Sequence, residues 1–221
     1  MTETSSVTGK LRVLIADDVQ ETRRSTRLML AVNPLVEVVA IARNGEEAVE
    51  LARRQLPDIA LMDINMPRKD GLTAIQEMLE FKPDMACIII SAEKENQVLR
   101  QAMSVGAREY LIKPFSVEEL NMAVHRVGKM VLENRKKEAQ ADQVRKQREA
   151  YLKRLAHEYA RSHRTDDQAL EVFEQLAASP QCEKRWLVTL AMIYVIRQKW
   201  GKLKALAARL EQQAQKSASN Q

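Results

Sequence analysis

Cysteine, glycine, proline and aromatic residues are all scarce in this chain of 221 residues. The two cysteines, Cys87 and Cys182, are too few and too far apart for a disulfide framework or a cysteine-ligated metal, so we expect two reduced, buried thiols. Six glycines and six prolines exclude a collagen-like or low-complexity chain, and the 4% aromatic content favours helix-rich packing. What remains is a globular protein whose 45% hydrophobic residues can form a core.

Long apolar runs are also missing. No stretch of about 18 apolar residues occurs, so the sequence predicts no membrane span. The first ten residues, MTETSSVTGK, lack the charged and apolar regions of a signal peptide. We therefore expect a cytoplasmic protein with no membrane partner.

Acidic residues are few in the C-terminal part of the chain. Residues 1–128 hold 16 Lys and Arg against 19 Asp and Glu, a net charge of −3, which leaves 35 − 16 = 19 basic and 30 − 19 = 11 acidic residues, a net charge of +8, for the remainder. A basic C-terminal part fits either a nucleic-acid partner or a solvated helical surface of mixed charge. The net charge of +5 therefore leaves both interpretations open.

Short runs of Val, Ile and Leu alternate with longer segments of helical periodicity in the first half of the chain. This alternation is typical of an α/β fold in which a doubly wound, five-stranded parallel sheet is buried on both faces by crossover helices. Such sheets bind ligands at the carboxyl ends of their strands. The predicted strands cover residues 11–16, 36–42, 58–63, 85–91 and 108–112.

Everything after Pro114 is predicted to be helical. The segment SVEEL is typical of a helix start, and one helix is expected from about residue 117 to 163. Ten of the seventeen residues from 133 to 149 are charged, which predicts a solvated spacer. An intermittent apolar seam leaves two interpretations open, a weak coiled coil and a single solvated helix; the seam consists of Val124, Val127, Val131, Ala141 and Val144.

Carboxylates stand where the predicted sheet should carry its site. Asp17 and Asp18 follow the first strand and Asp63 ends the third, so all three should meet at one edge. Clustered carboxylates repel one another unless a divalent cation lies among them, and oxygen ligands suit Mg²⁺. Ser91 and Lys113 end the last two strands and offer a hydroxyl and an ammonium to an anion.

Each of these residues also has an ordinary structural interpretation taken alone. The aspartates and Ser91 could be helix caps or turn residues, and Lys113 a solvated charge. Their joint occurrence at four strand ends favours phosphoryl chemistry instead. Gly71 and Gly106 are interpreted as turn residues.

Four blocks of sequence carry a resemblance to a known family. These are LRVLIADD, PDIALMDINMPRKDG, IIISA and GAREYLIKPF, in that order. Over residues 10–128 the chain resembles the flavodoxin-like receiver domains of two-component response regulators. The resemblance implies that Asp63 accepts a phosphoryl group from a histidine kinase or a phosphotransfer protein. Because no cyclase, phosphodiesterase, methylesterase or kinase motif is present, we do not expect the chain to be an enzyme beyond its own phosphorylation and dephosphorylation.

The resemblance also implies roles for the neighbouring residues. Mg²⁺ would be bound by Asp18, Asp63 and the backbone carbonyl of Asn65, with support from Asp17. Lys113, followed by a cis peptide bond to Pro114, would pair with the phosphoryl oxygens. Ser91 and Tyr110 would act as the switch, and Asn65 and Glu93 would border the attacking water.

The C-terminal part contains a weak internal similarity. Leu152, Leu155, Ala156 and Tyr159 recur 35 residues later (187 − 152) as Leu187, Leu190, Ala191 and Tyr194. This period suggests two tetratricopeptide-like helical hairpins, with a plain four-helix bundle as the alternative. Asp166 or Asp167 is expected to cap a helix. Trp186, Met192 and Trp200 are expected to pack internally, and His125, His157 and His163 to lie on helix surfaces.

The sequence thus predicts a chain of several parts. They are a receiver domain at 10–128, a charged helical linker at 129–149, an all-helical output domain at 150–215, and disordered tails at 1–9 and 216–221. Motifs of enzymatic output domains and of helix-turn-helix recognition are absent from the sequence. A protein partner of the helical output is therefore preferred, with RNA or DNA as the alternative and a homodimer left open.

Overall fold

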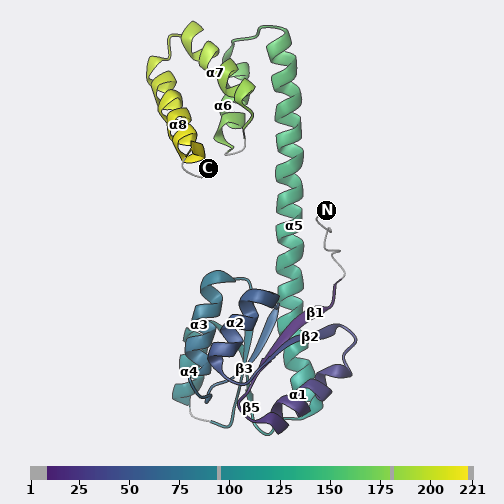
Figure 1. The fold of residues 1–221 in the computed structure, drawn as a ribbon. Coiled ribbons are helices and arrows are strands. Elements are labelled where there is room, and N and C mark those ends of the chain that lie inside the picture. Colours follow the sequence, from purple (N-terminus) through teal and green to yellow (C-terminus); the bar gives the residue numbers. More distant parts are fainter. Residues whose placement is uncertain (1–8, 94–95, 180–181, 219–221) are drawn as a thin grey trace. The chain divides into compact units, whose positions relative to one another are not determined.

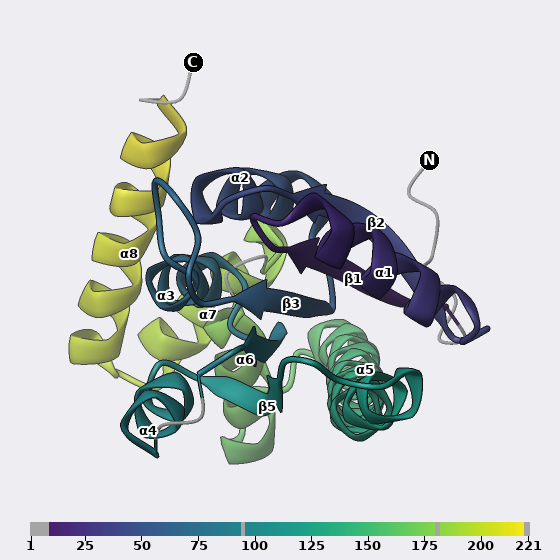
Figure 2. The ribbon, with the colours of Figure 1, turned by 90° about the horizontal axis from the view of Figure 1, so that it is seen from below.

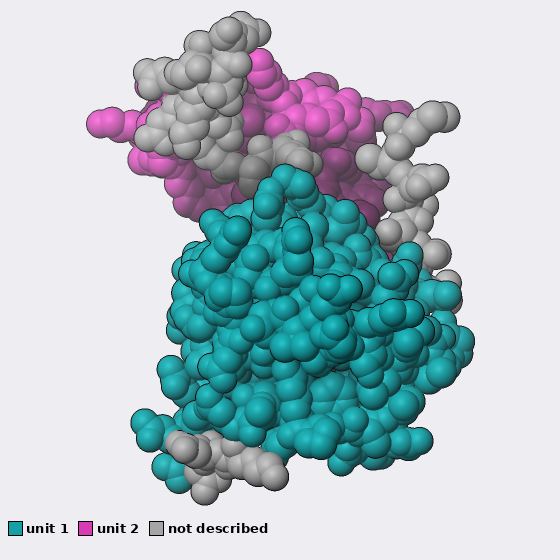
Figure 3. Space-filling view, turned by 60° about the horizontal axis from the view of Figure 1, so that its bottom comes forward, with its two compact units in different colours: residues 1–138 teal, residues 139–221 magenta. Residues whose placement is uncertain are grey.

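The computed structural model describes residues 9–93, 96–179 and 182–218. The chain forms two compact units, Met1–Glu138 and Ala139–Gln221, which Figure 3 shows in two colours. Most of the predicted tails, residues 1–8 and 219–221, lies outside the described residues, whereas residues 216–218 belong to the last helix. Among the described helices, none has the length and apolar character needed to cross a membrane.

The first unit is built on the predicted parallel sheet. Its strands are β1 (Leu11–Ala16), β2 (Val36–Ala42), β3 (Ile59–Asp63), β4 (Ala86–Ser91) and β5 (Ala107–Ile112). They pair in parallel in the order β2-β1-β3-β4-β5. Each strand lies within one residue of its predicted range, and the five-stranded fold is confirmed.

Helices cover both faces of this sheet (Figures 1 and 2). One core cluster joins the sheet to α2 (Gly45–Gln55), α3 (Gly71–Phe81) and α4 (Asn96–Ser104). The other joins it to α1 (Gln20–Ala31) and the start of α5. Leu14 and Met62 face the first cluster and Ile15 and Leu61 the second, all with at most 1% of their surface exposed, which explains why the strands are continuously apolar.

Helix α5 (Val117–Arg161) begins with reciprocal hydrogen bonds between Ser116 and Glu119. In this capping box Ser116 Oγ accepts from Glu119 N at 3.1 Å and Glu119 Oε2 accepts from Ser116 N at 2.8 Å. Its first four turns bury Val124, Val127 and Val131 against the sheet. Val144, farther along the predicted seam, is 63% exposed.

One ion pair extends the attachment of α5 to the first unit. The guanidinium of Arg135 pairs with Asp58, which stands just before β3 and has 2% of its surface exposed. The same carboxylate accepts a hydrogen bond from the backbone N–H of Arg12 at 2.9 Å. Arg135 lies one turn beyond the last buried valine of the helix, so the helix stays tied to the sheet after its apolar contacts end.

The second unit packs the rest of α5 with α6 (Asp167–Ala178), α7 (Lys184–Ile196) and α8 (Trp200–Ala218). Asp166 caps α6 by accepting from Ala169 N at 2.9 Å, so the first of the two cap candidates is the right one. All eight residues of the internal similarity belong to or pack against one core cluster around Phe173 and Trp186. This agrees with both the hairpin and the bundle interpretations.

Several packing predictions need correction. Trp186 is buried as expected, but Met192 and Trp200 are 61% and 58% exposed. Cys87 is a buried thiol, and its burial raises its pKa to about 12, whereas Cys182 is only partly buried. His125 and His157 are exposed on α5, but His163 follows the end of the helix with φ of 53°.

Candidate functional site

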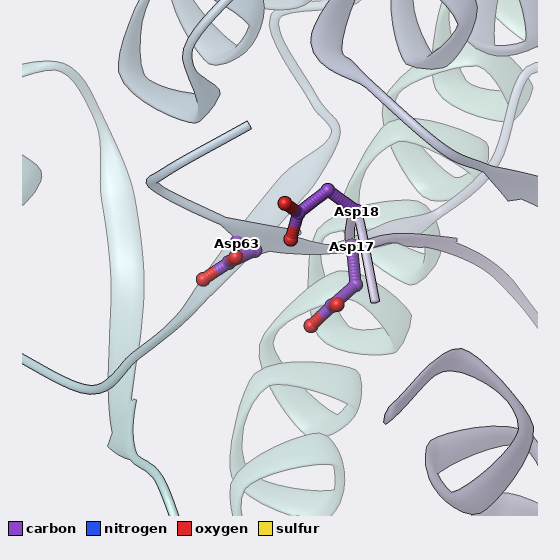
Figure 4. Close-up of side chains that lie close together, drawn as sticks. All are labelled: Asp17, Asp18 and Asp63. Carbon is purple, nitrogen blue, oxygen red and sulfur yellow. The ribbon is translucent and has the colours of Figure 1, made fainter. Parts of the chain in front are cut away.

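Three carboxylates meet at the carboxyl edge of the sheet, as the sequence predicts (Figure 4). Asp17 and Asp18 directly follow β1, and Asp63 is the last residue of β3. These strands are neighbours at the point where the strand order reverses, which is where parallel α/β sheets form their ligand sites. One oxygen from each carboxylate lies within 4.8 Å of the others.

Lys113 places its ammonium between two of these carboxylates. Its Nζ lies 2.7 Å from Asp17 Oδ2 and 3.1 Å from Asp63 Oδ1. Its backbone N–H donates to the carbonyl of Ser91 at 2.8 Å, and the peptide bond to Pro114 is cis, as the resemblance implied. The end of β5 is thereby fixed beside the ends of β1 and β3.

The charges at the site act on one another. Burial raises the pKa of the Asp63 carboxyl, Lys113 opposes this rise, and the neighbouring charges of Asp17 and Asp18 add to it. Burial alone would lower the pKa of Lys113, but its hydrogen bond with Asp17 and the charge of Asp63 outweigh burial and raise that pKa. Lys113 therefore stays protonated, and it compensates only part of the cluster's negative charge.

The donor set fits a hard divalent cation. Carboxylate oxygens are the preferred ligands of Mg²⁺, and Asp18 keeps one side of the cluster open to solvent for the waters that this ion retains. A cation here would also offset the repulsion among the three carboxylates. Asn65 follows two residues after Asp63 and is exposed.

Ser91, Tyr110 and Asn65 are all hydrogen-bonded to Glu93. Ser91 is fully buried, and its Oγ accepts from the backbone N–H of Glu93 at 3.1 Å. The Tyr110 hydroxyl donates to the Glu93 carbonyl at 2.8 Å, and Asn65 Nδ2 donates to the Glu93 carboxylate at 2.9 Å. A single loop residue therefore connects the edge of the carboxylate cluster to Tyr110.

Gly71 and Arg23 lie against the backbone of the site, although the sequence did not single out either residue for a role there. Gly71 is the first residue of α3 rather than a turn residue, and a Cβ there would lie 2.0 Å from the carbonyl oxygen of Asp63. Gly106 is a turn residue as expected, with φ of 102°. Arg23 on α1 donates to the carbonyl of Asp17 at 2.6 Å. Nothing in the sequence pattern distinguishes Arg23 from the other arginines of that helix.

Comparison with known proteins places the first unit in a family. A family model described as the response regulator receiver domain matches residues 13–125. The chain is also 44% identical over 107 residues to a protein-glutamate methylesterase/protein-glutamine glutaminase of Carboxydothermus hydrogenoformans, a match that covers 48% of this chain and 30% of that protein. Matches to the first three curated relatives cover 30%, 49% and 51% of their lengths, so the chain spans at most about half of them.

Solved structures agree with this result. The receiver domain of AraT, a response regulator from Geobacillus stearothermophilus, is 34% identical with a TM-score of 0.53, and the match covers 57% of this chain and 98% of that domain. A CheX–CheY–BeF3–Mg complex from Borrelia burgdorferi matches with 28% identity and a TM-score of 0.51, over 53% of this chain and 88% of the other. The chain therefore belongs to the response regulator receiver domain family of two-component signalling, and residues 13–125 are the part that carries the family's sequence.

Proposed function

We propose that the chain is a phosphorylation switch in which Asp63 is the phosphoacceptor. A carboxylate oxygen of Asp63 attacks the phosphorus of a phosphohistidine on a histidine kinase or phosphotransfer protein. The new O–P bond replaces the P–N bond, and the released imidazole takes up a proton. The observation that carries this proposal is the convergence of Asp17, Asp18, Asp63 and Lys113 on one edge of the sheet.

Mg²⁺ and Lys113 supply the positive charge that this transfer needs. Phosphoryl transfer depends on positioning and on stabilising charge at the equatorial oxygens. Asp17, Asp18 and Asp63, with the backbone carbonyl of Asn65, are proposed to hold the ion, and Lys113 to turn from the carboxylates to the phosphoryl group. The Borrelia burgdorferi relative, which was solved with BeF3 and Mg, supports this assignment.

The phosphoryl group is proposed to act through Ser91, Glu93 and Tyr110. Phosphorylation adds negative charge and acceptor oxygens beside Ser91, whose hydroxyl now accepts from Glu93 N. If Ser91 turns towards the phosphoryl group, its hydrogen bond with the backbone N–H of Glu93 is lost. Because Tyr110 is bonded to the Glu93 carbonyl, this movement frees Tyr110 to change position.

The proposed acceptor can be tested directly. We expect the wild-type chain with Mg²⁺ and acetyl phosphate to gain one phosphoryl group by intact mass, Asp63→Asn to gain none, and chelation of Mg²⁺ to abolish the gain. Asp84→Asn, a change at an aspartate outside the carboxylate cluster, is the matched control and should be labelled like wild type. Equal labelling of the Asp63→Asn variant would refute the assignment.

The output is proposed to be recognition of a protein partner by the helical domain at 150–215, joined to the receiver domain at 10–128 by the charged helix at 129–149. We propose binding and not catalysis because the sequence offers no motif of an enzymatic output domain. Nucleic acid is the alternative that the basic composition favours. Binding of generic RNA or DNA that weakens steeply with salt would favour this alternative over a protein partner.

A further inference from the structure

Helix α7 is apolar on all sides, although only one side is covered by its own unit. Trp186, Leu187, Leu190, Ile193 and Tyr194 are buried in the core of the second unit. The other side carries large apolar side chains that are exposed; these are Val188 (52%), Met192 (61%), Val195 (46%) and Ile196 (63%). A helix that is hydrophobic all round is normally buried all round, so the uncovered side is expected to have a partner.

The exposed apolar residues of α7 lie on one face of the helix. Val188, Met192, Val195 and Ile196 follow the spacing i, i+4, i+7 and i+8, which places them on one face roughly 100° wide. Trp200, four residues after Ile196, opens α8 and is 58% exposed. We call these five residues the α7 stripe. The spacing of the four residues on α7 matches the anchors by which one helix recognises another.

The charged residues within the segment that carries the α7 stripe are all basic. From Lys184 to Leu210 the sequence holds seven basic residues and no aspartate or glutamate. Arg185, Arg197 and Lys202 have carboxylate partners from outside this segment. Within the described part of the chain, Lys184 and Lys204 form no ion pair with a carboxylate. Lys184 lies one turn before Val188 on α7, and Lys204 lies one turn after Trp200 on α8.

We propose that the α7 stripe binds an amphipathic helix of a protein partner whose apolar face is bordered by carboxylates. Apolar anchors would cover the stripe, and the carboxylates would pair with Lys184 and Lys204. A second copy of this chain fits less well, because the segment from Lys184 to Leu210 is basic and would face the same basic segment of the other copy. Nucleic acid gains nothing from the apolar centre of the stripe. The inference rests on the proposal that the helical domain recognises a protein.

The test uses the full chain and two labelled helical peptides of about 20 residues, long enough to form a helix. Both carry the same leucine stripe, bordered by glutamates in one and by lysines in the other. We expect the glutamate peptide to bind roughly tenfold more tightly in fluorescence anisotropy. The Met192→Glu variant should lose this binding, whereas Val144→Glu, equally exposed on α5, should not. Circular dichroism would check that both variants fold.

Reversing the charge of the two lysines is the most discriminating part of this experiment. In the double variant Lys184→Glu and Lys204→Glu the preference should invert in favour of the lysine peptide. Equal binding of the two peptides, or no binding of either, would overturn the proposal. The proposal would also be overturned if the chain sedimented as a dimer, or bound anionic lipid vesicles, and the Met192→Glu variant lost that behaviour. None of these results bears on the phosphorylation of Asp63, which the intact-mass measurement tests separately.

Discussion

At position 71 the backbone passes so close to Asp63 that no side chain fits. The Cβ of an alanine would lie 2.0 Å from the Asp63 carbonyl oxygen, which belongs to the backbone and cannot rotate away as a side-chain atom could. We expect Gly71→Ala to destabilise the first unit by roughly 2–4 kcal/mol and to displace Asp63, so that labelling by acetyl phosphate also falls. Urea denaturation followed by circular dichroism measures the first effect.

Gly201 provides the matched control for this change. It stands in the first turn of α8, and a Cβ there would meet nothing within 4 Å. Because alanine restricts the unfolded chain more than glycine does, Gly201→Ala should leave stability unchanged or raise it by up to about 1 kcal/mol. A loss of similar size in both variants would show that the contact at Asp63 is not the cause.

Asp70 should make the stability of the first unit depend on pH. It caps α3 by accepting from Thr73 N at 2.9 Å and from the Thr73 hydroxyl at 2.7 Å. Burial by itself would raise the pKa of Asp70, but these hydrogen bonds outweigh burial and lower it. The folded state therefore binds the proton less readily than the unfolded state. The resulting stability is present above the unfolded pKa of about 3.9 and is lost as pH falls through the lower folded value.

Two substitutions at this position separate capping from charge. Asp70→Ala should cost about 1 kcal/mol at neutral pH because the cap is lost. Asp70→Asn keeps the cap and removes the charge, so wild type should be the more stable of the two at neutral pH, and the difference should disappear in acid. Urea denaturation at several pH values measures this difference. A difference that stays constant with pH would argue against the lowered pKa.

Residues at strand ends were predictable, and residues that act through the backbone were not. Asp17, Asp63, Ser91 and Lys113 each end or follow an apolar run, so the order of the chain already brought them to one edge. The hydrogen bonds of Glu93 involve its backbone N–H and carbonyl as well as its side chain, and Arg23 contacts a carbonyl. Backbone groups are the same in every residue, so the sequence gives no sign of which ones are used.

At the scale of elements, the attachment of α5 to the sheet depends on Arg135. Replacing Arg135 by alanine leaves the buried Asp58 carboxylate without its cation. Because the Arg135 side chain is 41% exposed, solvent reduces this penalty, and we expect a loss of about 1–2 kcal/mol. Arg126→Ala on the same helix removes the more exposed pair with Glu109 of β5 and should cost less than Arg135→Ala. Equal losses in urea denaturation would mean that Asp58 finds another partner.

Element boundaries followed the sequence where local signals were strong. The capping box at Ser116 and the cap at Asp166 mark helix starts that sequence spacing could locate. The exposed side of α7 could not be foreseen, because its residues are as apolar as those of its buried side. Periodicity separates apolar from polar faces and cannot separate an apolar face that is covered within the chain from one that is not.

At the scale of the whole molecule, each unit has its own core, so the two units should respond differently to Mg²⁺. Both tryptophans, Trp186 and Trp200, belong to the second unit, so their fluorescence reports on that unit alone. The carboxylate cluster belongs to the first unit. A ligand that binds only the folded state at ten times its Kd adds about 1.4 kcal/mol to stability. Mg²⁺ should therefore raise the melting temperature of the first unit by several degrees.

Thermal unfolding followed by circular dichroism and by tryptophan fluorescence can test this difference. Circular dichroism follows both units, and tryptophan fluorescence follows only the second. Mg²⁺ should raise the melting temperature of the circular dichroism transition that belongs to the first unit, and it should leave the melting temperature seen by fluorescence unchanged. In Asp63→Asn the shift should shrink, because the cluster loses one anionic ligand. A fluorescence transition that moves with Mg²⁺ by the same amount as the first unit would mean that the units unfold together. In that case helix α5, which contributes residues to both units, would couple the unfolding of one core to the unfolding of the other.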